Sequence, residues 1–217
     1  MNKNSILITI ISIIAVFAFL TGAYYLTSQP TETKVYADIN KVKQDDHVKW
    51  AKKGKALLVE YSDLQCPACR SMHELIKNQI EQNPQNKAIM SKVTFVYRHF
   101  PLTQHQHSFE ASLAAEAAGK QGKFFEMADL MFSRQDKWET DKNVNAVFET
   151  YAKELNLNEV QFKKDRDSQE VKQRVERDQN EGVQANVQAT PTFFLNGKAM
   201  QYATFDDFIK QLETAIK

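Results

Sequence analysis

Two cysteines are the residues of this chain whose spacing most clearly predicts chemistry. They lie in Cys66-Pro67-Ala68-Cys69 and are the only cysteines among the 217 residues. Two cysteines three residues apart in the first turn of a helix can close a disulfide and reopen it with little backbone movement. The first sulfur also faces the unpaired amides and the positive end of that helix, which stabilise a thiolate. The motif therefore predicts a redox pair, with Cys66 as the exposed nucleophile and Cys69 as the buried resolving thiol.

Two other uses of the cysteine pair are less consistent with its setting. A static disulfide stabilises a fold more when it closes a longer loop, and a four-residue loop encloses almost nothing. A zinc site would need further ligands, with His99, His105 and His107 as candidates. The spacing of His105 and His107 does not suit one face of a helix, and no second Cys-x-x-Cys is present. We therefore expect redox chemistry, with no bound metal and no cofactor.

The cysteine motif follows a predicted buried strand and opens a predicted helix. Residues 56–61 form a short apolar run, as expected of a strand that is covered on both faces. The helix is expected to run from about 69 to 82 and to end at Asn83-Pro84, since proline discourages its continuation. Residues 93–100 give a second strand. Strand, turn and helix thus place the two sulfurs at one end of a sheet.

The rest of the chain predicts a helical insertion followed by a return to the sheet. Residues from about 105 to 182 have helical periodicity, and Gly182 stands where a left-handed helix cap would be expected. Two strands, 192–195 and 198–201, then flank Asn196-Gly197, a pair that favours a type I′ hairpin turn. A final helix begins at Thr204, with Asp207 in a capping position. The fold class is therefore α/β, with a helical subdomain inserted into a small sheet.

The N-terminal residues are expected to direct the domain out of the cytoplasm. Residues 6–26 form an apolar run of about 21 residues, long enough for a helix to cross roughly 30 Å of hydrocarbon. Thr21-Gly22-Ala23 is an acceptable cleavage site, so residues 1–28 are predicted to be a membrane anchor or a signal peptide. Residues 29–34 read as a linker. Either interpretation places the domain on the extracytoplasmic side of the membrane, in the periplasm or its equivalent.

The charge balance excludes one broad class of partner. The chain carries 28 basic and 27 acidic residues, a formal net charge of +1. Nucleic-acid-binding domains usually concentrate positive charge, so no nucleic acid is expected as a partner.

Two segments carry a family resemblance. Residues 59–69 (Val-Glu-Tyr-Ser-Asp-Leu-Gln-Cys-Pro-Ala-Cys) and 189–197 (Ala-Thr-Pro-Thr-Phe-Phe-Leu-Asn-Gly), with the helical block between them, resemble the DsbA-type thiol-disulfide oxidoreductases. The membrane-anchored, BdbD-like branch is the more similar one. The resemblance covers roughly residues 35–217 and implies a thioredoxin fold with an inserted helical domain at about 105–182.

The resemblance also implies a substrate site. It predicts that the Thr190–Pro191 peptide is cis and faces Cys66, where the backbone of Thr190 would bind an extended substrate segment as an added strand. Pro67 and Ala68 would border the same site. From the residues alone, Pro191 would be an ordinary trans proline that opens a strand.

Glu60 is the third candidate catalytic residue. A carboxylate inside an apolar strand is costly unless it is paired or protonated, and burial raises its pKa. The resemblance implies that Glu60 shuttles the proton of the second cysteine, whereas a strand-end glutamate turned to solvent is the alternative. Lys92 and Arg98 are both candidate cationic partners, and the sequence does not choose between them.

Ala68 departs from the best-known members of the family, which have a histidine between the cysteines. A helix N-terminus alone supplies only about 0.3–1 kcal/mol of stabilisation to a thiolate. We therefore expect a milder oxidant than those members.

The predicted function is to introduce disulfides into reduced, exported proteins, with a quinone-linked membrane protein of the DsbB or VKOR type as reoxidant. Tethering to the membrane would raise the local concentration of that partner. A monomer is expected. A reductase or isomerase is the alternative within the same chemistry. A redox-inactive, tethered chaperone is the alternative outside it, in which Phe124, Phe125, Met127 and Met131 would line a groove for unfolded chains.

Overall fold

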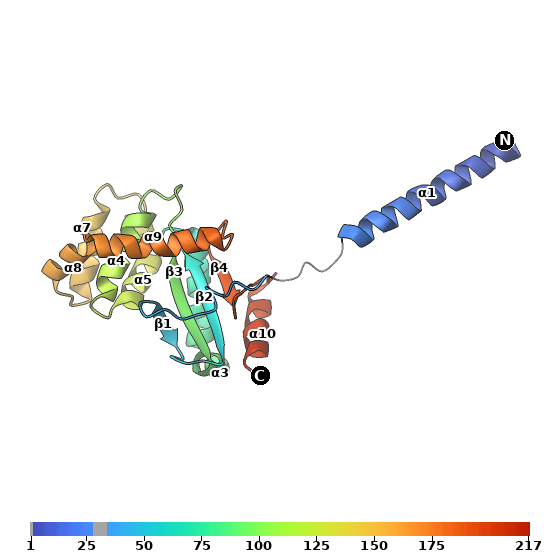
Figure 1. Ribbon diagram of the computed structural model, residues 1–217. Coiled ribbons are helices and arrows are strands. Elements are labelled where there is room, and N and C mark those ends of the chain that lie inside the picture. Colours follow the sequence, from blue (N-terminus) through green and yellow to red (C-terminus); the bar gives the residue numbers. More distant parts are fainter. Residues whose placement is uncertain (1, 28–33) are drawn as a thin grey trace. The chain divides into compact units, whose positions relative to one another are not determined.

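The computed structural model describes residues 2–27 and 34–217 (Figure 1). The chain divides into two compact units, 1–33 and 34–217. Residues 29–33 of the predicted linker, and residues 1 and 28 of the predicted N-terminal segment, lie outside the described residues.

The described part of the first unit, residues 2–27, holds helix α1 (Lys3–Thr27), on which large apolar side chains such as Phe17 and Phe19 are exposed. Within residues 2–27 and 34–217, no helix is both long and apolar enough to cross a membrane. That residues 1–28 are a membrane anchor or a signal peptide stays a prediction.

The second unit is built on a five-stranded sheet of order β1-β3-β2-β4-β5. Its strands are β1 (His47–Trp50), β2 (Ala56–Ser62), β3 (Val93–His99), β4 (Thr192–Leu195) and β5 (Lys198–Ala199). The central strand β2 runs parallel to β3 and antiparallel to β4, and β1 and β5 are antiparallel to their neighbours. This mixed α/β architecture confirms the predicted fold class.

The strand that precedes the cysteines is buried on both faces, as its apolar run predicts. Leu58 belongs to a hydrophobic cluster on one face of the sheet, and its neighbours Val59 and Tyr61 belong to a second cluster. Two details of the sheet differ from expectation. The edge strand β1 has too short and too polar a sequence to be predicted, and β5 has two residues instead of four.

The hairpin between β4 and β5 has the expected turn. Asn196 and Gly197 have φ values of 50° and 76°, the left-handed conformations that a type I′ turn requires. The final helix α10 (Phe205–Ala215) also begins as predicted, because the Thr204 hydroxyl accepts a hydrogen bond of 3.1 Å from the backbone N–H of Asp207.

The helix that carries the cysteine motif is α2 (Pro67–Ile76), and it continues as a π-helical turn over Lys77–Glu81. It ends before Asn83-Pro84, as expected. A 3₁₀ turn (Pro84–Asn86) and the short helix α3 (Lys87–Lys92) then lead into β3.

The inserted region follows β3 and is helical throughout. Its helices are α4 (Ser108–Gly119), α5 (Phe124–Ser133), α6 (Gln135–Trp138), α7 (Val144–Glu154), α8 (Glu159–Arg166) and α9 (Gln169–Gln184). In Figure 1, α9 leads from this group back along the sheet, where it contacts β3.

The prediction that Gly182 caps a helix is wrong. Gly182 lies inside α9, which continues to Gln184, and the residue with positive φ after the helix is Asn186 (φ 61°). Glycine is needed at 182 for space: a Cβ there would lie 2.6 Å from Cδ2 of Phe100 and 3.0 Å from Cδ1 of Tyr61. The close approach of α9 to the sheet explains this glycine.

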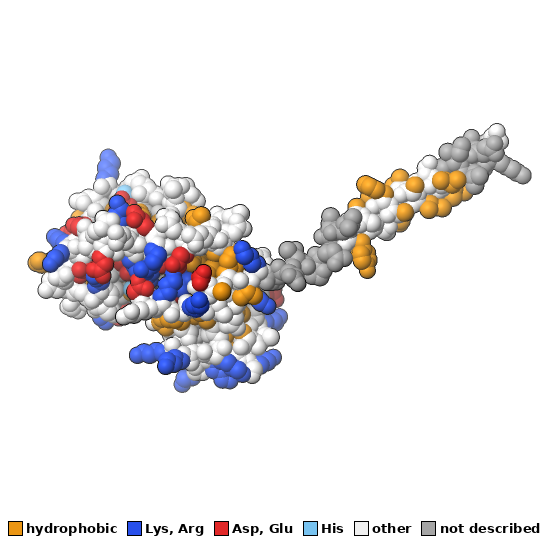
Figure 2. Space-filling model, viewed as in Figure 1, with side chains coloured by type: hydrophobic (Ala, Val, Ile, Leu, Met, Phe, Trp, Pro, Cys, Tyr) orange, Lys and Arg blue, Asp and Glu red, His pale blue; other side chains and the backbone are white. Residues whose placement is uncertain are grey.

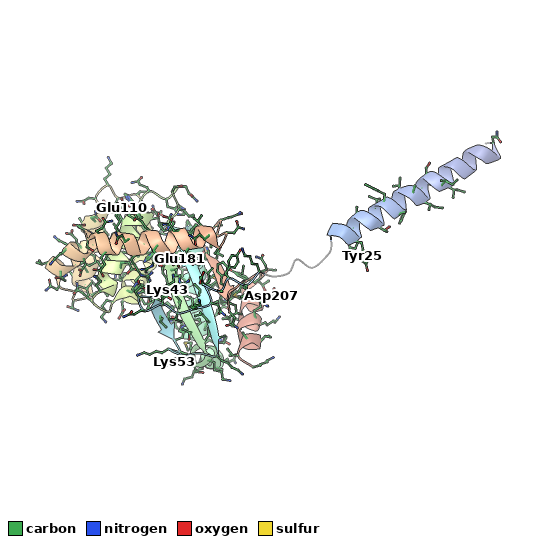
Figure 3. The ribbon with its side chains drawn as sticks, viewed as in Figure 1. Tyr25, Lys43, Lys53, Glu110, Glu181 and Asp207 are labelled. Carbon is green, nitrogen blue, oxygen red and sulfur yellow. The ribbon has the colours of Figure 1, made fainter. Side chains whose placement is uncertain are left out.

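Ion pairs join the segment before β1 to the insertion. Lys43 pairs with Glu181 of α9, and both are labelled in Figure 3. On the face shown in Figure 2, basic and acidic side chains alternate over the helical region.

The Met- and Phe-bearing segment of α5 lies in the core instead of lining a groove, since Phe124, Met127 and Met131 are buried.

Candidate active site

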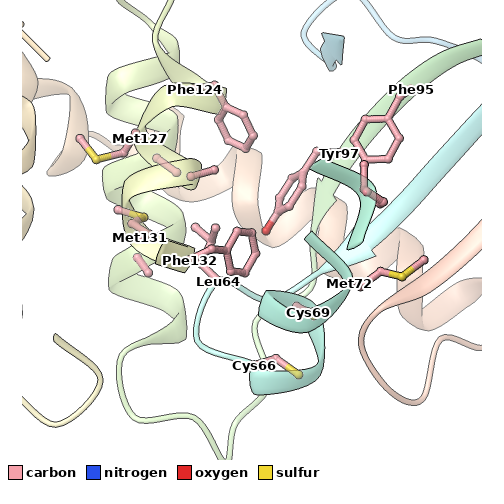
Figure 4. Close-up of a cluster of buried hydrophobic side chains, with 14 of the residues drawn as sticks. Leu64, Cys66, Cys69, Met72, Phe95, Tyr97, Phe124, Met127, Met131 and Phe132 are labelled. Carbon is pink, nitrogen blue, oxygen red and sulfur yellow. The ribbon is translucent and has the colours of Figure 1, made fainter. Parts of the chain in front are cut away.

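Cys66 is the N-cap residue of α2, with extended backbone angles (φ −74°, ψ 123°). Its carbonyl accepts the first helical hydrogen bond, from the N–H of Arg70 at 3.0 Å. Pro67, the next residue, has no backbone N–H, and the first turn of a helix does not need one. Figure 4 shows Cys66 at the tip of the helix and Cys69 one turn further in. Cys66 is 7% exposed and Cys69 0%, so the nucleophile is the more accessible sulfur but only a small part of it reaches solvent.

The two sulfurs have opposite acidities. The pKa of Cys66 is lowered to about 5, chiefly by a hydrogen bond from the Cys69 thiol and further by Thr190 and the backbone amides of Cys69 and Ala68. The pKa of Cys69 is raised well above its usual value by burial, by that same hydrogen bond and by the charge of Glu60. In the reduced pair, Cys66 therefore carries the thiolate and Cys69 keeps its proton.

The Thr190–Pro191 peptide is cis, as the family resemblance implies. The carbonyl oxygen of Thr190 lies 3.5 Å from Cys66 Sγ. The Thr190 hydroxyl is buried and completes no hydrogen bond within the described residues, yet it lies close enough to the sulfur to lower the pKa of Cys66. Pro67 and Ala68 are exposed beside the same sulfur. The structure thus brings all four predicted substrate-site residues to the edge of the redox pair.

Asp63, which no local sequence signal marks, holds the loop between β2 and α2. Its backbone carbonyl accepts the Cys66 N–H at 3.1 Å, and its own N–H points at Cys69 Sγ, 3.5 Å away. Its carboxylate is fully buried and accepts N–H bonds from Gln65 (2.8 Å), Leu102 (2.9 Å) and the His105 ring (2.7 Å). One residue therefore fixes the positions of both cysteines.

Gln65 and Gln135 attach the same loop to the helical insertion. Gln65 donates to the carbonyl of Glu139 at 2.8 Å and accepts from the N–H of His107 at 2.6 Å. Gln135 donates to the carbonyl of Leu64 at 3.0 Å. These contacts join residues far apart in the chain, so no local sequence signal could have identified them.

Glu60 is buried, at 5% exposure, and does not turn to solvent. Burial raises its pKa, while Ser62 and the charges of Lys49 and His73 act in the opposite direction. Neither predicted cationic partner pairs with it. Arg98 is held instead by Asp46, 3.0 Å away.

Arg98 lies on the opposite face of β3 from the residue that faces Glu60. Tyr97 is the register partner of Glu60, and side chains alternate along a strand. Lys92 lies in α3, before β3 begins, and no ion pair of Lys92 is found within the part of the chain that the structure describes.

The three histidines considered for zinc are used in separate places. His99 is buried against Glu116, at 2.9 Å, and His105 bonds Asp63. His107 contributes its backbone N–H to Gln65. Over residues 2–27 and 34–217, no group of three His, Cys, Asp or Glu side chains is arranged to hold a metal ion.

The arrangement of cysteines and Thr190 can be compared with known proteins. The family model described as thioredoxin matches residues 42–214, most of the second unit.

The chain belongs to the thioredoxin family.

Solved structures with the same fold include thiol-disulfide exchange proteins of the DsbA type. Oxidised BdbD from Bacillus subtilis is 23% identical and has a TM-score of 0.68, with 80% of this chain and 94% of BdbD covered. Alpha-DsbA1 from Wolbachia pipientis is 20% identical, with a TM-score of 0.66 over 81% of this chain and 94% of the other. MdbA from Corynebacterium diphtheriae is 18% identical, with a TM-score of 0.62 over 87% and 96%. This thioredoxin-family chain therefore has the DsbA-like fold that its motifs predict.

The chain also matches parts of much longer curated proteins. The Na(+)/H(+) antiporter NhaA 3 of Salinispora tropica is 32% identical over 154 residues, which is 70% of this chain and 22% of the antiporter. NhaA 1 of Mycobacterium sp. (strain KMS) is 34% identical over 156 residues, 70% of this chain and 24% of the relative. This thioredoxin-family chain thus spans less than a quarter of the length of these relatives.

Proposed function

We propose that this protein is a thiol-disulfide oxidoreductase that introduces disulfides into other proteins through Cys66 and Cys69. The observation that carries the proposal is the pairing of a Cys66 thiolate, whose pKa is about 5, with a buried, protonated Cys69 at the start of α2. A thiolate that is stabilised in the reduced enzyme makes the disulfide a better oxidant and Cys66 a good leaving group.

In the proposed reaction, the oxidised enzyme accepts electrons from a substrate dithiol. A substrate thiolate attacks Cys66 Sγ, the Cys66–Cys69 bond breaks, and Cys69 leaves and takes up a proton. The second substrate thiolate then attacks the substrate sulfur of the mixed disulfide and releases Cys66 as its thiolate. The substrate gains a disulfide and the enzyme is left reduced.

The Thr190 carbonyl, next to Cys66 Sγ, is proposed to bind the substrate backbone. A carbonyl in that position accepts an N–H from an extended peptide, the main-chain contact used when a strand is added to a site. Pro67 and Ala68, both uncharged, are exposed beside Cys66. Such a site recognises an unfolded segment by its backbone, which suits an enzyme with many substrates.

Location and reoxidation are part of the proposal. Disulfides persist in oxidising compartments, so an enzyme that forms them is useful outside the cytoplasm. We infer that the domain acts there as a monomer on exported proteins and is reoxidised by a quinone-linked membrane protein of the DsbB or VKOR type. MdbA, one of the proteins with the same fold, is described as a thiol-disulfide oxidoreductase. Labelling of Cys66 in intact cells by a membrane-impermeant thiol reagent tests the location; protection until the cells are lysed would contradict it.

The experiment that tests the activity uses a reduced, unfolded substrate whose function depends on its disulfides. Wild-type protein should restore substrate activity, and Cys66→Ser should abolish that restoration. Cys69→Ser keeps the nucleophile but removes the resolving thiol, so mixed disulfides with substrate should accumulate and be visible on non-reducing gels. Undiminished activity of Cys66→Ser would contradict the proposal.

A further inference from the structure

Two buried hydroxyl groups beside the redox pair have no hydrogen-bond partner. Ser62 is 0% exposed and Tyr97 is 3% exposed, and within the described residues neither Ser62 Oγ nor Tyr97 Oη completes a hydrogen bond. Buried polar groups are nearly always bonded, because leaving one unpaired costs free energy. Two such groups at one place call for a functional explanation.

Ser62 stands between Glu60 and Cys69. It is two residues after Glu60 in β2, so the two side chains point to the same face of the sheet. The next residue, Asp63, directs its N–H at Cys69 Sγ, 3.5 Å away, which places the sulfur at this end of the strand. The Ser62 hydroxyl lies close enough to both groups to act against the burial that raises the pKa of Glu60 and of Cys69.

Tyr97 faces Glu60 from the neighbouring strand. It is the register partner of Glu60 between β2 and β3, and Figure 4 shows its hydroxyl oxygen directed away from the strand, toward Phe132 and α2. The negative charges of Glu60 and Cys69 both raise the pKa of Tyr97, after the larger effect of burial. The hydroxyl is therefore next to the same two acids as Ser62.

A small cavity connects Glu60 with groups near the surface. Its volume is about 10 Å³, and it is lined by Lys49, Glu60, His73 and Tyr97 together with apolar side chains of β3, α2 and α5. A space of this size admits about one water molecule.

Two side chains that line the cavity, His73 and Lys49, also contact acidic groups of neighbouring elements. His73 Nε2 is 3.0 Å from Oδ1 of Asp129, which also binds Lys77 at 3.0 Å, and Lys49 Nζ is 2.6 Å from Oε1 of Glu81. The His73 side chain is 15% exposed. Of the groups in these pairs, Lys49 of β1 and His73 of α2 are the ones whose charges act on the pKa of Glu60.

We propose that the Ser62 hydroxyl passes the proton between Cys69 and Glu60 during disulfide exchange, and that Tyr97 and the cavity connect Glu60 to His73 at the surface. The inference rests on the proposed function and deepens it. Ser62 is two residues after Glu60 in β2 and directly precedes Asp63, whose N–H points at Cys69 Sγ.

Every proton is accounted for both when the enzyme disulfide is reduced and when it is formed again. When a substrate thiolate breaks the Cys66–Cys69 bond, the departing Cys69 thiolate takes the Ser62 hydroxyl proton, and Ser62 takes one from the Glu60 carboxylic acid. Glu60 then regains a proton from solvent through the cavity. When the dithiol is reoxidised, Cys69 gives up its proton along the same path in reverse, and its thiolate attacks Cys66 Sγ of the mixed disulfide.

The test follows the oxidation of the reduced full-length protein by oxidised glutathione. Attack of Cys66 on glutathione disulfide is second order, whereas the following attack of Cys69 is first order and sets the plateau rate at high glutathione disulfide. Ser62→Ala should lower the plateau rate about tenfold or more, since positioned proton transfer contributes roughly 10²–10⁴-fold in enzymes. Ser62→Thr, which keeps a hydroxyl, should restore it. Tyr97→Phe should lower it less.

Two further readouts separate proton transfer from a structural effect. The plateau rate of wild type should fall in D₂O, and that isotope effect should change in Ser62→Ala, while the second-order rate of Cys66 should stay the same. A plateau rate of Ser62→Ala within twofold of wild type, with an unchanged isotope effect, would overturn the inference and leave the proposed function intact. Failure of wild type to react with glutathione disulfide would instead overturn the proposed function itself.

Discussion

The carbonyl oxygen of Thr190 lies 3.5 Å from Cys66 Sγ, although the two residues are 124 positions apart in the chain. The sheet produces this contact. Antiparallel pairing of β2 with β4 brings the residues before Thr192 beside the end of β2, from which the cysteine loop starts. The whole helical insertion lies between the two strands in sequence, yet it leaves their ends together.

The Thr190 hydroxyl should contribute measurably to the acidity of Cys66. Thr190→Val keeps the shape of the side chain and removes the hydroxyl, so the pKa of Cys66 should rise by about one pH unit, as expected for a hydrogen bond to a charged group. The pH dependence of Cys66 alkylation in the Cys69→Ala background measures the effect, with Thr190→Ser as the control that keeps the hydroxyl. Identical profiles for Thr190→Val and Thr190→Ser would show that the hydroxyl has no such role.

The low pKa of Cys66 also predicts how stability depends on pH. Its pKa is about 5 in the folded reduced protein and about 8.5 in an unfolded chain. Stabilisation of the reduced form is therefore present in full near pH 8.5 and is lost as the pH falls toward 5. Denaturant unfolding of the reduced and oxidised proteins across this range should show the difference between them moving in favour of the reduced form as the pH rises. Reduced Cys66→Ser should lack that trend; if it keeps the trend, another group is responsible.

Asp63 is expected to stabilise the folded protein as well as to position the two cysteines. Asp63→Asn keeps the size of the side chain but replaces one carboxylate oxygen by an amide that cannot accept the N–H groups of Leu102 and His105. The cost should be about 1–3 kcal/mol of unfolding free energy, the usual penalty for buried donors without a partner. Urea unfolding measures it. His105→Gln, which removes only the partly exposed donor, should cost less. An Asp63→Asn protein as stable as wild type would contradict the proposed contribution of this carboxylate to stability.

The packing of α9 against the sheet gives a prediction at Gly182. Gly182→Ala places a methyl group 2.6 Å from the Phe100 ring, and overpacking of this kind typically costs about 1–3 kcal/mol. Thermal unfolding should show a clear loss. Asn186→Gly, at the residue that does adopt positive φ, should be nearly neutral. A Gly182→Ala protein as stable as wild type would contradict the close packing of α9 against Phe100.

The sequence was a good guide wherever the signal was local. Strands β2, β3 and β4, the Asn196-Gly197 turn, the Thr204 cap and the start of α2 at the cysteine motif all follow from short patterns with a clear physical cause. The same patterns were misleading at Gly182, because a glycine used for close packing looks the same in sequence as a glycine used for a left-handed turn.

The parts of the site that could not be predicted depend on tertiary contacts. Arg98 was a candidate partner for Glu60, but strand alternation directs it to Asp46 on the other face of the sheet. The roles of Asp63 and Gln65 need Leu102, His105 and His107 to be brought close by the fold. No spacing within the chain encodes those distances.

The central claim is that Cys66 and Cys69 form a reversible dithiol–disulfide couple that oxidises other proteins. Equilibrating the protein with glutathione buffers of known potential, and counting its free thiols, tests this most directly. We predict one two-electron transition at a potential between about −120 mV, the value of a strong oxidase, and about −270 mV, that of a reductase. A value at or below about −270 mV would contradict the oxidase assignment in favour of a reductase. The absence of any reversible transition would contradict the claim altogether.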